Sequence, residues 1–386
     1  MKAVVFILLS MKANQIFSDW GHLLQFLPDN MTELAKASGA VKRWRNITTG
    51  EELLRINLAY VVEDLSLRST AGWSSQSEMA EMKDTSVLHR LKQSVPFLEQ
   101  VLAHLLNHRL HGEPANGPTF NIKDASVLSE LGSTGTDWRI HATYNPQYMR
   151  LSRVEVTDYT GGERLDRDHY LTDEIVLGDR GLSRAKGMHA VAEENAFSLV
   201  RMHWQNIRLQ DQHDNALNLQ SILDRADAGD QQTIVYIPCE GKKPLRARLL
   251  VRPLPTDKRE KARRSVRTKA TKKGRTPGSI ALQLAGYFCV LTTLPEEIAS
   301  IDLVFELYRI RWQIELFFKR CKSLLHLDQL RADDPLLVRA YILGKLIEVA
   351  LITLLTTEGE SFSPWGVPRQ RRAAPIYMEA SAFASY

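Results

Sequence analysis

The stretch "DEIVLGDRG" (residues 173–181) decides the fold class. Its compact apolar run ends in Gly-Asp-Arg-Gly, which predicts a buried strand that runs into a turn. The next stretch, "LSRAKGMHAVAEEN" (182–195), has the periodicity of a helix, and "AFSLVRMHW" (196–204) is typical of another strand. This succession predicts a mixed α/β domain.

Further strands are predicted on both sides of this stretch. Three alternating or β-branched runs upstream are separated by Gly, Asn and Pro, which predicts three antiparallel strands. They are "FNIKDASVL" (120–128), "DWRIHATYN" (137–145) and "MRLSRVEVTDYTGG" (149–162). Downstream, residues 205–292 are again strand-like, with "QTIVYIP" (232–238), "ARLLVRPL" (247–254) and "GYFCVLTTL" (286–294).

The remaining chain divides by composition. Residues 1–115 repeat apolar residues at spacings of three and four and show no β-alternating run, so a helical domain is predicted there. The patterns divide the rest into a mixed α/β segment at 119–204, a β-rich segment at 205–292, a helical segment at 293–357 and an irregular tail at 358–386, which lacks periodicity.

Composition excludes several classes of protein. The chain has 386 residues, of which 44% are hydrophobic, and three cysteines too far apart to predict a disulfide framework or a zinc site. The longest apolar stretch, residues 341–355, contains Lys345 and Glu348 and predicts a buried helix rather than a membrane span. The N-terminal run VVFILL is short for a signal peptide, and a later start at Met11 is the competing explanation. A cytoplasmic protein is expected.

The positive charge is unevenly placed. Of the eighteen residues 258–275, ten are Lys or Arg and only Glu260 is acidic, within a chain whose net charge is +5. Such a segment cannot bury apolar surface, so a mobile loop is predicted. It is either a solvated loop or a clamp on a nucleic-acid backbone. The clamp would use cations such as Arg263, Arg264, Lys272 and Lys273.

The stretch "YRIRWQIELFFKRCK" (308–322) carries an unusual set of polar residues. It lies in a helical pattern that is predicted to run without interruption through residues 296–327. At 100° per residue, the four residues Tyr308, Arg311, Glu315 and Lys322 fall within an arc of about 60°, opposite an apolar face. A salt-bridged surface face is the plain explanation.

Two aspartates are candidates to meet Glu315. Asp124 lies within the first predicted strand, where a carboxylate is costly unless it is paired or binds a cation. Asp179 follows the buried strand, at the kind of strand end where ligand sites gather. An edge-strand Asp and a turn Asp are the structural alternatives. Together the three carboxylates predict an oxygen-only site suited to Mg²⁺ or Mn²⁺ rather than zinc.

The N-terminal region contains a possible DNA-reading motif. The segments "DLSLRSTAGW" (64–73) and "DTSVLHRLKQS" (84–94), with a turn-like gap between them, are typical of a helix-turn-helix. Arg90 and Lys92 would lie on the second helix and contact DNA. A plain helical bundle is the alternative.

The spacing Tyr-x2-Arg-x3-Glu-x6-Lys resembles the Y-R-E-K signature of cut-and-paste transposases of bacterial insertion sequences. The segments around Asp124 (122–141) and Asp179 (175–188) are similar to those around the family's two catalytic aspartates. The resemblance covers roughly residues 30 to 350. The chain departs from many relatives in having Ala-Ser after Asp124.

The resemblance implies an RNase H-like catalytic domain at 119–204 and 293–357, with a β-rich insertion at 205–292. Because family members usually continue as helices beyond this domain, the irregular tail at 358–386 makes a truncated or frameshifted copy the alternative to an intact one. It implies that Asp124, Asp179 and Glu315 bind two Mg²⁺ or Mn²⁺ ions. It further implies that three residues, Tyr308, Arg311 and Lys322, contact the element end. Trp312 is a candidate to stack on bases, with a core tryptophan as the alternative.

The expected partners are the terminal inverted repeats, target DNA and a second copy of the chain, with no membrane. The expected place is the cytoplasm, at the nucleoid. The expected reaction is strand cleavage at the element ends, hairpin formation and strand transfer. The alternatives are a decayed copy that only binds DNA as a repressor and a stand-alone metal-dependent nuclease.

Overall fold

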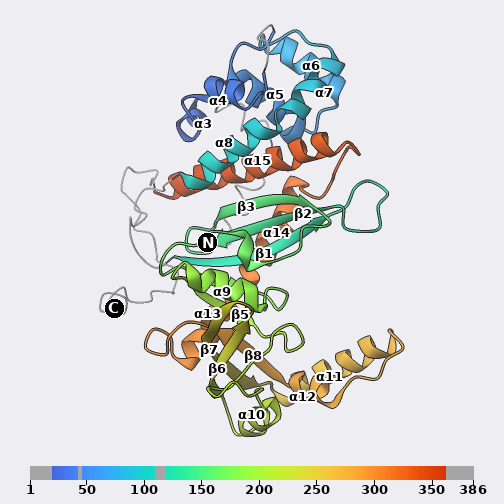
Figure 1. Ribbon diagram of the computed structural model, residues 1–386. Coiled ribbons are helices and arrows are strands. Elements are labelled where there is room, and N and C mark those ends of the chain that lie inside the picture. Colours follow the sequence, from blue (N-terminus) through green and yellow to red (C-terminus); the bar gives the residue numbers. More distant parts are fainter. Residues whose placement is uncertain (1–19, 42–45, 109–118, 362–386) are drawn as a thin grey trace. The chain divides into compact units, whose positions relative to one another are not determined.

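The computed structural model describes residues 20–41, 46–108 and 119–361 (Figure 1). These residues form two compact units. Unit 1 takes its residues from 1–115, 125–161 and 315–376, and unit 2 from 116–124 and 162–314. Most of the expected tail, residues 362–386, and the N-terminal run both lie outside the described residues.

Eight strands form one mixed sheet in the order β3-β2-β1-β4-β5-β8-β7-β6. They are β1 (Phe120–Leu128), β2 (Trp138–Asn145), β3 (Arg150–Asp158), β4 (Ile175–Gly178), β5 (Phe197–Arg201), β6 (Gln231–Cys239), β7 (Lys242–Pro253) and β8 (Tyr287–Thr292). Strand β4 is parallel to β1 and β5, whereas β3 pairs antiparallel with β2 and β8 pairs antiparallel with β5 and β7. The predicted strands and the mixed α/β class are confirmed, and the order of the first five strands fits an RNase H-like fold.

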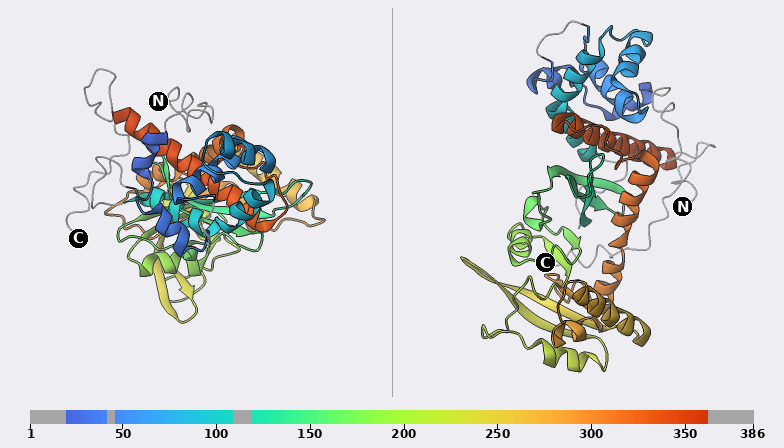
Figure 2. Two further views of the ribbon diagram at one scale, coloured as in Figure 1. Left: turned by 90° about the horizontal axis from the view of Figure 1, so that it is seen from above. Right: turned by 90° about the vertical axis from the view of Figure 1, so that its right-hand side faces the viewer.

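The strands of the expected insertion continue the sheet of unit 2. Strand β8 pairs with β5, and the long hairpin of β6 and β7 follows (Figure 2). Side chains from β4 to β8 share one buried cluster, which includes Val176, Val200, Val235, Leu249 and Leu291. The helices of this unit are η2 (Leu165–Arg167), α9 (Ala185–Glu193), α10 (Leu219–Ala226), α11 (Thr256–Thr271), α12 (Ser279–Leu284) and α13 (Ile301–Arg309). The insertion and the neighbouring strands therefore share a single core.

Unit 1 gathers the N-terminal helices around a helix from the other end of the chain. The N-terminal helices are α3 (Trp20–Leu23), η1 (Leu24–Phe26), α4 (Met31–Ala37), α5 (Gly50–Val62), α6 (Leu67–Gln76), α7 (Asp84–Gln93) and α8 (Val95–Asn107). The later part of the chain adds α14 (Trp312–Leu325), which belongs to this unit from Glu315 on, and α15 (Pro335–Ser361). Helix α5 starts with a capping box, in which Thr49 and Glu52 each satisfy the other's backbone N–H. Helix α15 packs against α5, α7, α8 and β3. Its buried Lys345 and Glu348 pair at 3.1 Å, as a core position requires.

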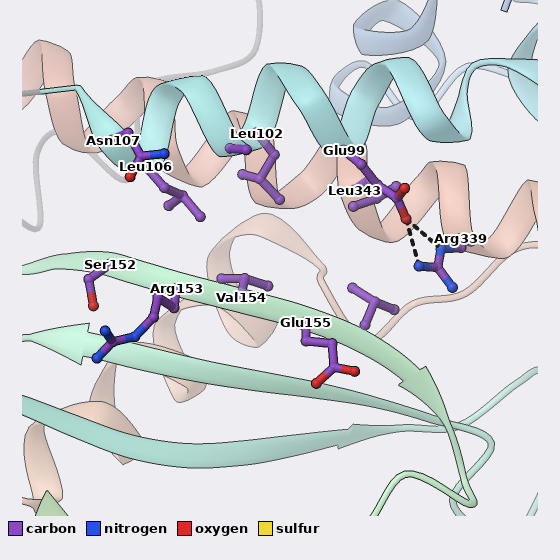
Figure 3. Close-up of a pocket in the computed structure, with 12 residues that line it drawn as sticks. Glu99, Leu102, Leu106, Asn107, Ser152, Arg153, Val154, Glu155, Arg339 and Leu343 are labelled. Atoms are coloured by element: carbon purple, nitrogen blue, oxygen red, sulfur yellow. Dashed lines mark hydrogen bonds and ion pairs between the residues drawn. The ribbon is translucent and has the colours of Figure 1, made fainter. Parts of the chain in front are cut away.

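A pocket of about 370 Å³ lies in unit 1 between α8, α15 and β3 (Figure 3). Leu102, Leu106 and Leu343 supply much of its apolar wall. The guanidinium group of Arg339 pairs with Glu99 at 2.6 Å beside it. This ion pair connects α15 to α8, and it is formed by the charged groups at that end of the pocket.

Two predictions about helices are wrong. The segment 258–275, expected as a loop, contains the helix α11, because Ala, Lys, Arg and Glu favour helices even where no apolar surface is buried. The helix expected at 296–327 is two helices, since α13 ends at Arg309 and α14 begins at Trp312. The backbone N–H groups of Ile310 and Arg311 bond three residues back, as in a tightened 3₁₀ turn.

Within the described part of the chain, no helix has the length and apolar character needed to cross a membrane.

Candidate functional site

Two aspartates lie side by side in unit 2, at the carboxyl end of β4. The parallel register of β1 and β4 ends with the pair Lys123 and Gly178, so Asp124 and Asp179 are the next residues along the two chains. Neighbouring strands lie about 4.8 Å apart, and paired positions point to the same face. Lys123 points to the other face, where its ammonium group pairs with Asp168. Both aspartates are half-exposed, so they can meet a ligand.

The turn after β4 fixes the Asp179 carboxylate. Its Oδ1 accepts the backbone N–H of Gly181 at 2.7 Å and that of Leu182 at 3.3 Å. A Cβ on Gly181 would lie 3.1 Å from this Oδ1 and 3.1 Å from Glu163 Oε2. Only glycine at position 181 leaves room for the carboxylates of Asp179 and Glu163 to lie this close to the turn. Among the described residues, none donates a hydrogen bond to Asp179 Oδ2, which leaves this oxygen available.

Positively charged groups surround Asp179. Burial lowers the pKa of Arg180, and the charge of Arg201 at the end of β5 lowers it further. His203 follows two residues later, and burial and then Arg180 lower its pKa, against a smaller opposite effect of Asp179. A lowered pKa favours the neutral imidazole. The same strand ends thus carry a carboxylate, which can hold a metal cation, beside arginines, which can attract an anion.

Tyr308 and Arg311 adjoin this group within unit 2. Burial raises the pKa of Tyr308 to about 12, although Arg311 and Arg201 oppose the rise. The rings of Tyr308 and Phe288 pack edge to face, with 5.1 Å between their centroids. The guanidinium group of Arg201 lies 5.3 Å from the centroid of the Phe288 ring. Tyr308 is only 8% exposed, so the prediction that it lies on an exposed stripe is wrong. The break between α13 and α14 is the reason, because one helical wheel does not describe both helices.

Glu315 and Lys322 both belong to α14. Glu315 is exposed in the first turn and belongs to unit 1, whose last segment it begins, so its approach to the aspartates stays a prediction. Lys322 donates from Nζ to the carbonyl oxygen of Val127 in β1 at 2.8 Å. Trp312 is 52% exposed, so the alternative of a core tryptophan is wrong.

The donor set fits a hard divalent cation. Asp124 and Asp179 offer only oxygen, at adjacent positions, and Asp179 Oδ2 is available. Oxygen ligands of this kind suit Mg²⁺ or Mn²⁺. No three His, Cys, Asp or Glu residues in the described ranges lie close enough together to hold a metal ion. A site completed by Glu315 therefore stays a prediction.

Arg90 and Lys92, the residues of the N-terminal region predicted to contact DNA, both lie on α7 in unit 1. Helices α6 and α7 are present, with seven residues (77–83) between them, which is longer than the usual turn of a helix-turn-helix. Lys92 pairs with Asp334 at 2.8 Å, and burial lowers the pKa of Arg90. A role of these two residues in binding DNA stays a prediction.

The predicted contacts of the basic segment differ in exposure. Arg263 Nε donates to the carbonyl oxygen of Leu282 in α12 at 3.3 Å, and Arg264 is 78% exposed. Lys272 and Lys273 follow α11 and are exposed.

Sequence reasoning missed four side chains near Asp179: Glu163, Arg180, Arg201 and His203. Arg180 lies within the Gly-Asp-Arg-Gly turn, and Arg201 ends a predicted strand. Because ligand sites gather at strand ends, the sequence could have indicated both residues. Glu163 precedes β4 by twelve residues in a loop, and no pattern indicated its approach to Gly181.

The fold and the acidic strand ends define an RNase H-like α/β protein, and comparisons identify its family. The family described as "Transposase DDE domain" matches residues 135–349, more than half of the chain, including Asp179 and Glu315. The InsL protein of insertion sequence element IS186A from Escherichia coli (strain K12), named as a transposase, is 33% identical over 360 residues, which is 91% of this chain and 97% of InsL. The transposase of element IS421 from Escherichia coli is 33% identical over 361 residues, with the same coverage of both chains. That of element IS231F from Bacillus thuringiensis subsp. israelensis is 30% identical over 135 residues, or 35% of this chain and 28% of that protein.

The chain therefore belongs to the DDE transposases, and it is an enzyme of an insertion sequence that acts on DNA.

Proposed function

We propose that Asp124, Asp179 and Glu315 bind two divalent cations, Mg²⁺ or Mn²⁺, and cleave DNA strands at the ends of the insertion sequence. The adjacent register of Asp124 and Asp179 at the strand ends carries this proposal. DDE transposases generally depend on divalent metal. The bound ions would neutralise charge on the reacting phosphate and on the attacking and leaving oxygens.

The side chains around the aspartates would position the phosphate. Arg311 can hold phosphate oxygens with two parallel N–H groups, and Lys322 can act as a point charge. Burial raises the pKa of Tyr308 to about 12, so its hydroxyl keeps its proton even in alkaline solution and can donate a hydrogen bond. Trp312 is exposed and can stack on a base, which contributes about 1–3 kcal/mol. Most of the catalysis would come from this positioning and charge neutralisation.

The complete reaction would consist of successive phosphoryl transfers. Water attacks the phosphorus at the element end, and the 3′-oxygen leaves as a 3′-hydroxyl. This hydroxyl attacks a phosphorus of the opposite strand and forms a hairpin, and the 3′-oxygen of the flanking DNA leaves as a hydroxyl. Water then attacks the hairpin phosphorus and frees the 3′-hydroxyl of the element again. That hydroxyl finally attacks a phosphorus of target DNA and joins the element to it, while the 3′-oxygen of the target strand leaves. The spacing of Tyr308, Arg311, Glu315 and Lys322 supports this hairpin route, because it matches the Y-R-E-K signature.

Recognition of the element ends would lie with the N-terminal helices. Helix α7 and its residues Arg90 and Lys92 would contact the terminal inverted repeats. Two copies of the chain would hold two ends in a synaptic complex. The protein would work in the cytoplasm, at the nucleoid.

A labelled duplex that carries the element's own end tests the proposal. Wild-type protein is incubated with Mg²⁺ or Mn²⁺ beside Glu315→Gln, which keeps the size of the side chain and removes its charge. Glu306→Gln is the matched control, because Glu306 is an exposed glutamate on α13. We expect nicks and hairpins from wild type and the control, and binding without cleavage from Glu315→Gln.

The other outcomes separate the alternatives. Equal cleavage by wild type and Glu315→Gln would refute the site. Binding without cleavage by wild type would indicate a decayed copy that acts as a repressor. Cleavage of any duplex, without preference for the element end and without joining, would indicate a stand-alone nuclease.

A further inference from the structure

The net positive charge of the chain comes from one short segment. Residues 256–275 contain ten Lys or Arg residues and two acids, Asp257 and Glu260, a net charge of +8. The whole chain carries +5, so the remaining residues carry a net −3. An anionic partner that binds through long-range attraction would therefore be drawn to this segment first.

Helix α11, which holds most of these charges, is attached to unit 2 by one face. None of its residues is buried, but Arg259, Ala262, Arg263, Val266 and Ala270 are half-buried and recur at helical spacing. These five residues define the attached face.

Two arginines of the attached face make specific contacts. Arg259 pairs with Asp227 at 3.0 Å, and its guanidinium group lies 5.2 Å over the ring of Tyr287. Tyr287 in turn donates from its hydroxyl to Asp227 at 2.7 Å. Arg263 donates to the carbonyl oxygen of Leu282 in α12. The attachment therefore holds the helix in place although it buries no apolar core.

The exposed face of α11 carries five other cations: Lys258, Lys261, Arg264, Arg267 and Lys269. Arg264 lies 3.6 Å from Glu260. For the other four, the described parts of the chain provide no ion pair. Figure 1 shows α11 projecting beyond α12, away from the strands. Like charges on neighbouring helical turns repel each other, and an anionic partner would relieve this repulsion.

We propose that the exposed face of α11 binds the phosphate backbone of duplex DNA without reading its sequence. The choice of DNA rests on the proposed function. The helix has 16 residues and is about 24 Å long, which matches about seven base-pair steps of 3.4 Å. Of its five cations, the three lysines act as point charges, and Arg267 has no ion-pair partner among the described residues to orient it. Contacts of such cations with phosphates fix the position of the protein but carry no sequence information. This surface fits the target, or any duplex that flanks the element.

The test measures binding of the full-length protein to a labelled duplex of random sequence over a range of KCl concentrations. The exposed-face variant is K258Q/K261Q/R267Q. The matched control is R208Q/K243Q/R246Q, which removes the same charge from exposed positions elsewhere in unit 2. Circular dichroism and melting should be equal for both, because no substituted residue is buried.

For the exposed-face variant, we expect the slope of log affinity against log salt to become shallower by about 2 to 3, since each phosphate contact contributes about 0.9. Affinity at fixed salt should fall tenfold or more, and the control should change it less than threefold. Equal effects of the two variants would overturn the proposal. So would a loss confined to the element end, because that would indicate sequence reading.

The Glu315→Gln variant separates this proposal from the proposed function. It should bind random duplex as wild type does and cleave nothing. If wild type cleaves the element end but the two triple variants bind random DNA equally, only the proposal for α11 fails. If α11 carries the salt-dependent binding and Glu315→Gln still cleaves, only the site assignment fails.

Discussion

The acidic strand ends and the basic helix α11 belong to the same unit but are built in opposite ways. Asp124 and Asp179 are placed by the register of two strands, and backbone N–H groups fix one carboxylate. The cations of α11 lie along an exposed helix face, and most of them have no fixed partner there. Chemistry at one phosphorus needs fixed atoms, whereas attraction to a polyanion needs only enough charge in the right place.

The two regions should therefore respond differently to single substitutions. One change at the strand ends should abolish the reaction. One change on α11 should weaken binding by a small, repeatable step. The following predictions run from the largest expected effect to the smallest.

Asp179→Asn should lower the rate of cleavage at the element end by roughly a thousandfold, or about 4 kcal/mol, because a neutral amide cannot hold a divalent cation as a carboxylate does. DNA binding should persist. The control is Asp173→Asn, at an exposed position before the other end of β4 with φ of 62°, which asparagine tolerates. Equal cleavage by Asp179→Asn and Asp173→Asn would show that the reaction does not need the Asp179 carboxylate.

Gly181→Ala should lower cleavage about tenfold to a hundredfold, because its Cβ would press on Asp179 Oδ1 and Glu163 Oε2, and small displacements of reacting groups cost about that much. Single-turnover rates at saturating protein measure the effect. Gly162→Ala is the control, since nothing lies within 4 Å of its added Cβ. A wild-type rate for Gly181→Ala would show that the fixed position of Asp179 does not matter.

Tyr308→Phe should change the pH dependence of folding. Burial raises the pKa of Tyr308 to about 12, from about 10 in the unfolded chain. Its contribution to the free energy of unfolding is therefore fully present below about pH 10 and is lost as pH rises toward 12. Urea unfolding at pH 9 and pH 11 should show that the free energy of unfolding falls less for the variant than for wild type, by about 1.3 kcal/mol.

Tyr159→Phe is the control for this measurement, because Tyr159 is 67% exposed. An equal loss of stability in wild type and Tyr308→Phe would contradict the buried phenol.

Lys261→Gln should weaken binding to random duplex by roughly threefold and reduce the salt slope by about 0.9, because it removes one phosphate contact. Cleavage by protein already bound to the element end is measured in parallel. A loss as large as that of the triple variant would mean that one lysine, rather than the distributed charge, carries the binding.

The sequence predicted the strands because their apolar residues alternate, and this pattern depends only on local burial. It also placed Asp124 within a strand and Asp179 at a strand end, as the structure does, while their role as metal ligands stays a prediction. It failed at α11, because composition alone suggested a loop. The contact of Arg259 with Asp227 spans 32 residues and cannot be seen in the sequence.

The break between α13 and α14 was missed for a different reason. The apolar periodicity continues through Ile310 and Arg311, so nothing marks the end of α13. Tyr308 was consequently predicted on an exposed face. The ion pair of Lys92 with Asp334, 242 residues apart, was equally beyond any local pattern.

The pairing of β8 with β5 has a mechanical consequence. DNA held by α11 would pull on a helix that follows β7 after only two residues and that leads to β8 through α12. Backbone hydrogen bonds connect β7 to β8, β8 to β5, and β5 to β4, the strand that Asp179 follows. Tension in a DNA molecule would thus load these ladders in the same stiff sheet that holds Asp179, the proposed metal ligand, and only Leu254 and Pro255 separate α11 from β7.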